Sequence, residues 1–278
     1  MSDAEPCALD VSVVVPFFNP GEPLASTIEG LATALGADGW SFEIIAVSDG
    51  STDPPPQAIA DLGVAELRVE AFDANRGKGA ALRAGMQLGT GRYVGFIDAD
   101  GDIPPSAMVE LVRVAASEDP DAVLGSKQGS AKEGTRWSRR VGSVAWRWLA
   151  RVLFGLSVDS QTGVKLFRAD VLGDALPRTS LDGFAFDLEL IVAARGLGHT
   201  NLREVPVPVN RQGSSTVSMS TASRMLGDLV TIFWRTRLRR RYVPAVPAPT
   251  RTVSSSGPTH DSSGPLPSRA ARSARGLE

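Results

Sequence analysis

Two patterns of apolar residues alternate along the first half of the chain. Short runs rich in β-branched and other apolar residues predict five strands: Val11–Val15, Phe42–Val47, Val64–Val69, Tyr93–Ile97 and Ala122–Leu124. Apolar residues at helical spacing predict four helices between them: Pro23–Leu35, Pro56–Asp61, Gly79–Leu88 and Pro105–Ala116. This alternation predicts an α/β fold in which a mostly parallel central sheet carries helices on both faces.

Two later segments, Trp137–Leu156 and Ala222–Arg241, show an apolar stripe bordered by tryptophan and arginine. Such side chains suit the interface between water and lipid, which makes both segments candidates for membrane contact. Two ordinary helices that face the core and leave their arginines in solvent would give the same pattern. Because the chain has two such segments, we favour interfacial binding.

Charge is distributed unevenly over the 278 residues, whose formal net charge is −2. From Arg235 onward there are nine arginines and two acidic residues, a charge of +7, which leaves −9 for the residues before it. An acidic body with a basic end is unlike a nucleic-acid-binding domain, so we expect no nucleic-acid partner. It fits a protein that meets an anionic surface through one edge.

Amino-acid composition limits the cellular compartments and the structural frameworks that are possible for this chain. One cysteine, Cys7, excludes an internal disulfide framework, and two histidines argue against a histidine-based zinc site. The first residues have neither the basic region nor the apolar core of a secretory signal, and no stretch reaches the roughly 18 apolar residues that span a bilayer. We therefore expect a cytoplasmic protein, bound peripherally to the inner face of the cell membrane.

Four segments are expected along the chain. Residues 1–9 form an N-terminal leader, and 10–221 form the α/β domain. Residues 222–242 form a basic amphipathic helix, and the Pro-, Ser- and Arg-rich residues 243–278 form a disordered tail.

Three aspartates, Asp98, Asp100 and Asp102, follow the predicted strand Tyr93–Ile97 at alternate positions. Ligands bind at the carboxyl ends of strands in open α/β sheets, and alternate residues point the same way. Carboxylates this close repel one another unless a cation lies between them, and oxygen-only ligation suits Mg²⁺ or Mn²⁺. Asp102 alone has another explanation, because it is a candidate cap for the following helix. Capping explains one aspartate but not three, so we predict a metal site.

Polar groups also follow the first two predicted strands. Pro16, Phe18 and Asn19 come after the first strand, and Asp49 stands in the turn after the second. These positions suit a nucleotide base and ribose, although an ordinary turn also explains Asp49-Gly50-Ser51.

A glycine-rich turn, Asn75-Arg76-Gly77-Lys78-Gly79, begins the third predicted helix. It matches neither the P-loop nor the Gly-x-Gly-x-x-Gly pattern. Arg76 and Lys78 at a helix N-terminus nevertheless form a candidate anion site.

Together these motifs resemble the inverting glycosyltransferases of family 2, which have the GT-A (nucleotide-diphospho-sugar transferase) fold. The resemblance rests on four motifs in order: Val-Val-Pro-Phe-Phe-Asn, Ser-Asp-Gly-Ser-Thr-Asp, Asn-Arg-Gly-Lys-Gly and Asp-Ala-Asp-Gly. Further on, two motifs are similar to the polyprenyl-phosphate branch: Asp159-Ser160-Gln161-Thr162-Gly163 and Phe184-Ala185-Phe186-Asp187-Leu188-Glu189. Within that branch the chain is most similar to dolichyl-phosphate glucosyltransferases and next to dolichyl-phosphate mannose synthases. The resemblance covers about residues 11 to 235. Ser48 departs from it, because the family usually has an aspartate there.

The resemblance implies a role for each group of residues. Asp98 and Asp100, with Asp102 as a third ligand, would hold the metal on the donor diphosphate. Contacts with the nucleotide sugar would come from Pro16, Phe18, Asn19, Asp49, Arg76, Lys78, Asp98 and Ala99. The acceptor phosphate would be held by Lys127, Arg139, Arg211 and Ser214. Residues beside the sugar and the acceptor would be Asp159, Gln161, Asp187 and Glu189.

The expected reaction moves a hexose from UDP-glucose or GDP-mannose to polyprenyl phosphate at the membrane surface, with Mg²⁺ or Mn²⁺ as cofactor. A lipid phosphate is already an anionic nucleophile, whereas a hydroxyl acceptor would need a general base, for which Asp187 or Asp159 is the candidate. One alternative keeps the fold but uses a soluble metabolite or natural-product acceptor. Another is a catalytically silent protein that binds nucleotide sugars, against which the intact Asp98/Asp100 pair argues.

Overall fold

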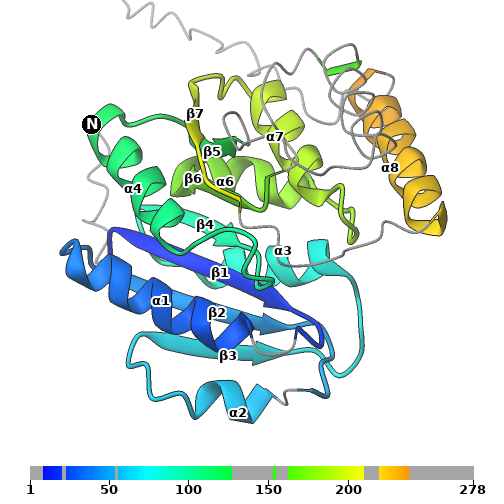
Figure 1. Ribbon diagram of the computed structural model, residues 1–278. Coiled ribbons are helices and arrows are strands. Elements are labelled where there is room, and N and C mark those ends of the chain that lie inside the picture. Colours follow the sequence, from blue (N-terminus) through cyan, green and yellow to red (C-terminus); the bar gives the residue numbers. More distant parts are fainter. Residues whose placement is uncertain are drawn as a thin grey trace, which may run out of the picture. The chain divides into compact units, whose positions relative to one another are not determined.

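The computed structural model describes residues 9–20, 23–53, 56–126, 153–154, 162–209 and 219–237, all within one compact unit, Met1–Pro244. Their centre is a seven-stranded sheet with the order β3-β2-β1-β4-β6-β5-β7 (Figure 1). Three predicted segments lie outside the described residues: the tail at 243–278, the leader at 1–9 apart from Leu9, and the amphipathic segment at Trp137–Leu156 apart from two of its residues.

The first half of the chain forms the parallel part of the sheet. Its four strands are β1 (Val11–Phe17), β2 (Phe42–Ser48), β3 (Leu67–Ala71) and β4 (Tyr93–Ile97). β1 pairs in parallel with both β2 and β4, and every residue of β1 is buried. The predicted α/β alternation is confirmed. The third strand starts three residues later than predicted, because a turn from the carbonyl of Val64 to the amide of Leu67 precedes it.

The second half completes the sheet with one reversed strand. Its members are β5 (Ala122–Ser126), β6 (Val164–Arg168) and β7 (Leu202–Pro206). β6 lies antiparallel between β4 and β5, whereas β7 pairs in parallel with β5. β6 and β7 were not predicted as strands. β6 has a lysine at its second position, and β7 is half exposed and charged, so neither shows a continuous apolar run.

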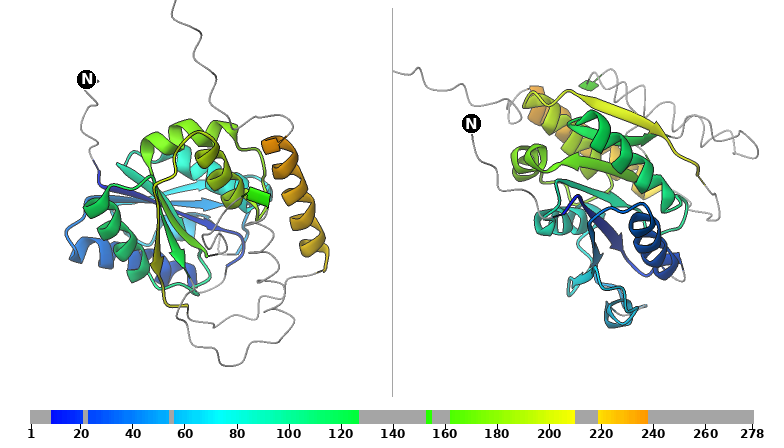
Figure 2. Two further views of the ribbon diagram at one scale, coloured as in Figure 1. Left: turned by 90° about the horizontal axis from the view of Figure 1, so that it is seen from above. Right: turned by 90° about the vertical axis from the view of Figure 1, so that its left-hand side faces the viewer.

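Helices cover both faces of the sheet (Figure 2). One face packs against α1 (Pro23–Ala37) and α4 (Ser106–Glu118), and the short α2 (Pro56–Ala60) lies beside β3. The other face is covered by α3 (Lys78–Leu88), α6 (Ala169–Ala175) and α7 (Phe186–Gly196), and α8 (Met219–Arg237) packs against α7. A short 3-10 turn, Leu176–Arg178, follows α6. The result is a layered core on each side of the sheet.

The last described helix, α8, belongs to this core. Leu229 and Ile232 are buried in the same cluster as α3 and α7. Val230 and Trp234 are 62% and 44% exposed, so a second, outward apolar face exists. Among the described helices, none combines the length and the hydropathy needed to cross a bilayer.

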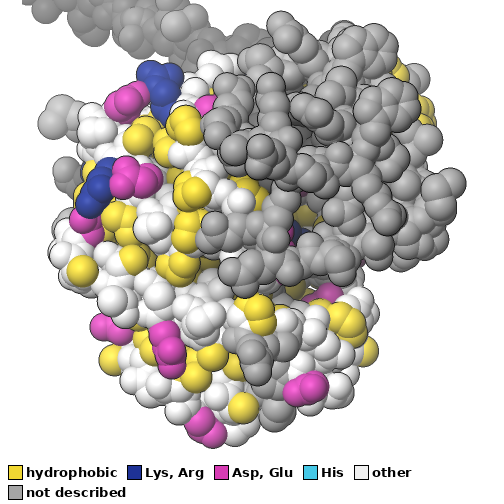
Figure 3. Space-filling view, in the orientation of Figure 1, with side chains coloured by type: hydrophobic (Ala, Val, Ile, Leu, Met, Phe, Trp, Pro, Cys, Tyr) yellow, Lys and Arg dark blue, Asp and Glu magenta, His cyan; other side chains and the backbone are white. Residues whose placement is uncertain are grey.

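Acidic side chains are scattered over the described part of the face shown in Figure 3. This distribution fits the acidic body that the charge count assigns to the residues before Arg235.

Candidate active site

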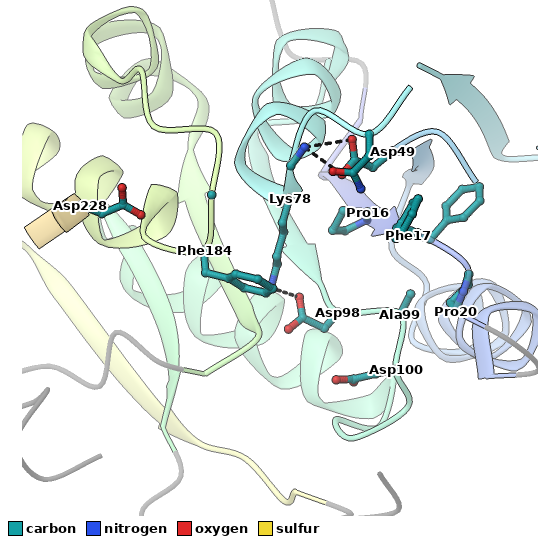
Figure 4. Close-up of a pocket in the computed structure, with 14 residues that line it drawn as sticks. Pro16, Phe17, Pro20, Asp49, Lys78, Asp98, Ala99, Asp100, Phe184 and Asp228 are labelled. Carbon is teal, nitrogen blue, oxygen red and sulfur yellow. Dashed lines mark hydrogen bonds and ion pairs between the residues drawn. The ribbon is translucent and has the colours of Figure 1, made fainter. Parts of the chain in front are cut away.

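A pocket of about 670 Å³ opens where β1, β2 and β4 end (Figure 4). The β1 exit contributes Pro16, Phe17 and Phe18, and the β4 exit contributes Asp98, Ala99 and Asp100. A cavity of this size is suited to a ligand as large as a nucleotide. It forms at this edge because the carboxyl ends of parallel strands meet there.

Asp49, at the end of β2, lines the pocket and fixes the turn that leads into α3. Its Oδ1 accepts a hydrogen bond from the amide of Arg76 at 2.6 Å, and its Oδ2 accepts one from the amide of Gly77 at 2.9 Å. Gly77 has φ +105°, a conformation that L side chains rarely adopt. The predicted nucleoside carboxylate therefore also has a structural task, which is to hold the anion-site turn against β2.

Lys78, the first residue of α3, reaches across the pocket to Asp98 (Figure 4). Its Nζ lies 2.5 Å from Oδ1 of Asp98 in an ion pair. Burial alone would lower the pKa of Lys78, but the Asp98 carboxylate, helped by Asp187 and Asp100, raises that pKa above its usual value. The site therefore holds a stable cation directly beside the predicted metal ligand.

Asp100 and Asp102 continue the aspartate series. Burial raises the pKa of Asp100; the backbone amide of Asp102 opposes this shift, and the neighbouring Asp98 and Asp102 charges add to it. That amide donates to Oδ1 of Asp100 at 3.0 Å. The alternative that Asp102 caps the next helix is wrong, because α4 begins at Ser106 with Pro105 at its N-cap.

The carboxylates of Asp98 and Asp100 are a suitable donor set for a divalent cation that also binds substrate phosphates and water. Oδ1 of Asp102 is buried and has no hydrogen-bond partner among the described residues, and Asp98 and Asp100 face one pocket. Within the described ranges, no three His, Cys, Asp or Glu side chains are placed so that together they could hold a metal ion, so the predicted three-aspartate ligand set is not assembled there. Mg²⁺ is commonly bound by one or two carboxylates together with substrate phosphates and water, so this donor set suits it.

Two predicted nucleotide contacts have other partners. The amide oxygen of Asn19 accepts from the backbone of Thr52 and Asp53, at 2.9 and 3.2 Å, and so ties the β1 exit to the β2 exit. The guanidinium of Arg76 lies over the ring of Phe72, 4.7 Å from its centroid. Neither side chain is among the described residues that line the pocket.

A second ion pair joins the fully buried Lys165 to the partly buried Asp187. Nζ of Lys165 is fully buried, 2.7 Å from Oδ2 of Asp187, and it also donates to the carbonyl of Thr162 at 2.6 Å. Both Lys165 and Lys78 lie near the ring of Phe96, at 5.2 and 5.7 Å from its centroid. Sequence reasoning placed Asp187 beside the acceptor but missed its partner. The available signal was a lysine inside Val164-Lys165-Leu166-Phe167, whose other three residues are apolar.

Glu189, also predicted near the acceptor, is fully buried on α7 and is absent from the described pocket lining. Its Oε2 accepts from the amides of Ser180 and Leu181, and its Oε1 lies 2.7 Å from Nη1 of Arg235. Arg235 was counted in the basic cluster expected at a membrane. The structure corrects this, because the guanidinium of Arg235 is held inward by a buried carboxylate.

Several pocket residues had no predicted role. They are Pro20 after β1, Gly183 and Phe184 before α7, and Asp228 on α8. Phe184 is 62% exposed. Six predicted residues lie outside the described ranges: Lys127, Arg139, Asp159, Gln161, Arg211 and Ser214.

Known proteins resemble this chain in sequence. The model of the family described as glycosyl transferase family 2 matches residues 12–174. A dolichyl-phosphate beta-glucosyltransferase of Trichomonas vaginalis is 26% identical over 243 residues, which cover 82% of this chain and 72% of that protein. The enzymes of the same name from Drosophila melanogaster and Saccharomyces cerevisiae are 29% and 27% identical, covering 68% and 80% of this chain and 64% and 73% of those proteins.

Solved structures resemble it in fold. Mannosyl-3-phosphoglycerate synthase from Rubrobacter xylanophilus matches with a TM-score of 0.66 and 18% identity, over 87% of this chain and 78% of that one. Glucosyl-3-phosphoglycerate synthase from Mycobacterium tuberculosis, in complex with Mn²⁺, UDP and phosphoglyceric acid, matches with a TM-score of 0.63 and 20% identity, over 86% and 81%. The chain therefore belongs to glycosyl transferase family 2; it has the GT-A fold and is a glycosyltransferase, as its four ordered motifs predicted.

Proposed function

We propose that this enzyme transfers a hexose, with inversion, from UDP-glucose or GDP-mannose to polyprenyl phosphate at a membrane surface. The observation that carries the proposal is the juxtaposition in one pocket of Lys78 with the carboxylates of Asp98 and Asp100. A diphosphate needs cationic partners, and a carboxylate pair provides a place for a second cation beside them.

The chain's own residues act on the leaving group. When the bond between C1 of the sugar and the diphosphate oxygen breaks, negative charge grows on the diphosphate. Lys78 lies at the N-terminus of α3, where the helix dipole also favours an anion. Asp98 and Asp100 would hold Mg²⁺ or Mn²⁺, which supplies further stabilisation of that charge.

Donor identity rests on the relatives rather than on the pocket. The curated relatives are named as beta-glucosyltransferases, which favours UDP-glucose over GDP-mannose. Position 48, where the family usually has an aspartate, does not distinguish the two donors. Oγ of Ser48 accepts a hydrogen bond from the amide of Ser51 at 3.0 Å and so stabilises the turn.

A phosphate acceptor is favoured by the state of Asp187. Its Oδ1 accepts from the amide of Leu188, and its Oδ2 pairs with Lys165. A carboxylate whose oxygens are both engaged is poorly placed to take a proton from a hydroxyl acceptor. A lipid phosphate needs no such base, because it is already ionised at neutral pH.

Membrane contact is favoured by α8. Val230 and Trp234 lie four residues apart on its outer side and are exposed, and the arginines at Arg237, Arg239, Arg240 and Arg241 follow. An apolar face followed by basic residues suits an anionic membrane surface.

The test is a panel of UDP- and GDP-sugars, each with Mg²⁺ or Mn²⁺, with and without a short polyprenyl phosphate, and with products followed by mass. We expect a hexosyl polyprenyl phosphate that forms from one donor only. Transfer to a soluble acceptor such as a phosphorylated metabolite, with none to the lipid, would support the soluble-acceptor alternative instead. Metal-dependent binding of donor without any turnover would support the silent binding protein.

A further inference from the structure

The loop Thr179–Phe184 connects the short turn after α6 to α7 and forms one wall of the pocket through Gly183 and Phe184. It has no helix or strand of its own. A loop without regular structure keeps its position only through side-chain and backbone contacts with its neighbours. Those contacts come from two sides.

On one side the loop is bound to the first turns of α3, which begin within the glycine-rich turn Asn75–Gly79 (the anion-site turn). The amide of Gly79 donates to the carbonyl of Asp182 at 2.7 Å. Arg83 donates from Nη2 to the carbonyl of Leu181 and pairs through Nη1 with the Asp182 carboxylate, each at 2.7 Å. The space is fully used, since a Cβ atom on Gly79 would lie 2.7 Å from the carbonyl oxygen of Leu181.

On the other side the loop is bound to α7 and α8. The buried Glu189 carboxylate accepts from the amides of Ser180 and Leu181, both at 2.8 Å. Arg235 of α8 pairs with the other oxygen of Glu189 and also contacts the hydroxyl of Ser180. A fully buried carboxylate is tolerated only when its donors satisfy it, so these four groups form one unit.

We infer that Glu189 and Arg235 are positioning residues: they fix the Thr179–Phe184 loop, and through that loop they set the place of the donor-binding turn at Lys78. Neither is among the described residues of the pocket lining, so the effect is indirect. The inference rests on the proposed function only in taking the pocket as the nucleotide site. It replaces the expectation that Glu189 meets the acceptor.

The physical reason is that the loop is held between two sets of contacts. If Arg235 is lost, the ion pair at Oε1 of the buried Glu189 is lost with it, and the buried charge is compensated less well. Loss of the Arg235 cation or of the Glu189 charge therefore weakens the hydrogen bonds that the amides of Ser180 and Leu181 donate to Glu189. The carbonyls of Leu181 and Asp182 then move relative to Arg83 and to the amide of Gly79, next to Lys78.

The experiment uses full-length Glu189→Gln, Arg235→Met and the double variant, with Arg203→Met as control. Arg203 lies on β7, outside the loop, and forms an ion pair with Glu118 at the end of α4. Both side chains are about half exposed. Amide hydrogen exchange at 180–184 and affinity for UDP, with GDP as a second probe, are measured on folded protein. We expect each single variant to lose about tenfold in nucleotide affinity and to exchange faster at these amides. The double variant should be no worse than the singles, because the two residues act as a unit.

Unchanged exchange at 180–184 together with unchanged nucleotide affinity in both single variants would overturn the inference. If either variant does not fold, Ser180→Ala removes one contact of Arg235 without stranding a buried charge, and its exchange and affinity decide the question in the same way. If wild-type protein binds neither nucleotide, the proposed function fails. The exchange data then still test whether Glu189 and Arg235 hold the loop.

Discussion

Nζ of Lys78 lies 2.5 Å from Oδ1 of Asp98, so a helix N-terminal lysine is the present partner of a predicted metal ligand. A divalent cation and an ammonium group cannot share that oxygen at close range without repelling each other. If Asp98 holds a metal through this oxygen, as proposed, Lys78 would exchange Asp98 for a donor phosphate when metal and donor bind.

Replacing Lys78 with Met should separate these two effects. We expect donor affinity to fall by about tenfold or more, because a charge-assisted contact to phosphate is lost. Mn²⁺ affinity without nucleotide should rise, because Asp98 loses its competing cation. Calorimetric titration with Mn²⁺ alone and then with UDP measures both. Exposed Arg68, paired with Glu70 on β3, offers a control in Arg68→Met, which should change neither. Weaker Mn²⁺ binding in Lys78→Met would show that the lysine does not compete for Asp98.

The aspartate series should separate by position. Asp98→Asn and Asp100→Asn each remove a charge where the leaving group develops its own, so we expect turnover to fall by about 10²-fold or more. Asp102→Asn tests the buried oxygen that has no hydrogen-bond partner among the described residues, since a comparable loss would make it a third ligand. Initial rates at saturating donor and a range of Mn²⁺ concentrations distinguish the three. Full activity of the wild type in excess EDTA would contradict a metal role altogether.

The ion pair between Asp187 and the fully buried Lys165 should make a large contribution to the free energy of unfolding. Lys165→Met leaves Asp187 without its cation, and breaking a buried pair in this way costs about 3–5 kcal/mol. Urea unfolding followed by tryptophan fluorescence gives the change in the free energy of unfolding. Restoring neutrality with the double variant Lys165→Met/Asp187→Asn should recover part of the loss. Additive losses in the double variant would mean that the two side chains do not stabilise each other.

Gly77 and Gly63 form a matched pair for testing the anion-site turn. Both have positive φ, +105° and +72°, so alanine strains the backbone at each. A Cβ on Gly77 would also collide with the carbonyl of Asp182, whereas nothing lies within 4 Å of a Cβ on Gly63. Gly63→Ala should cost about 1 kcal/mol and leave activity intact. Gly77→Ala should cost more and should also weaken donor binding, measured as a rise in the donor KM. Equal effects on the donor KM would deny the turn a part in binding.

Membrane binding should depend on the arginines beyond Arg235. Changing Arg237, Arg239, Arg240 and Arg241 to Ser should release the protein from anionic vesicles, since each basic residue near such a surface contributes about 1 kcal/mol. The same four positions changed to Lys provide the control and should retain binding. Salt should mimic the serine variant, because attraction is screened within about 8 Å at physiological ionic strength. Arg235 must be left in place, because its loss would disturb Glu189 as well. Failure of the wild type to bind anionic vesicles at low salt would refute the peripheral-membrane proposal.

The sequence predicted the first half of the fold well because three of its four strands, β1, β2 and β4, are almost wholly buried. β1 and β4 are uniformly buried and therefore appear as continuous apolar runs. β6 escaped prediction because Lys165, which interrupts its pattern, is neutralised by Asp187 from a helix 22 residues further on. No local pattern records such a long-range pair.

The part of the site formed by strand ends could be predicted from the sequence. The contacts made by residues of α7 and α8, in the second half of the chain, could not. Asp98, Asp100, Asp49 and Lys78 were found because turns at the carboxyl ends of parallel strands converge by geometry. Glu189 and Arg235 were assigned to acceptor and membrane because sequence shows their charge but not the direction of their side chains. Only the packing of α7 against α8 shows that the two charges neutralise each other inside the protein.

α8 has a consequence for how this enzyme can be changed. It supplies Asp228 to the pocket wall, Leu229 and Ile232 to the core, and Arg235 to Glu189, while Val230 and Trp234 face outward. The face proposed for membrane contact and the pocket wall thus belong to one helix. A shortened chain that ends before Met219 would lack part of the pocket wall and of the core, and a change to this helix that alters the proposed membrane contact would also alter the pocket.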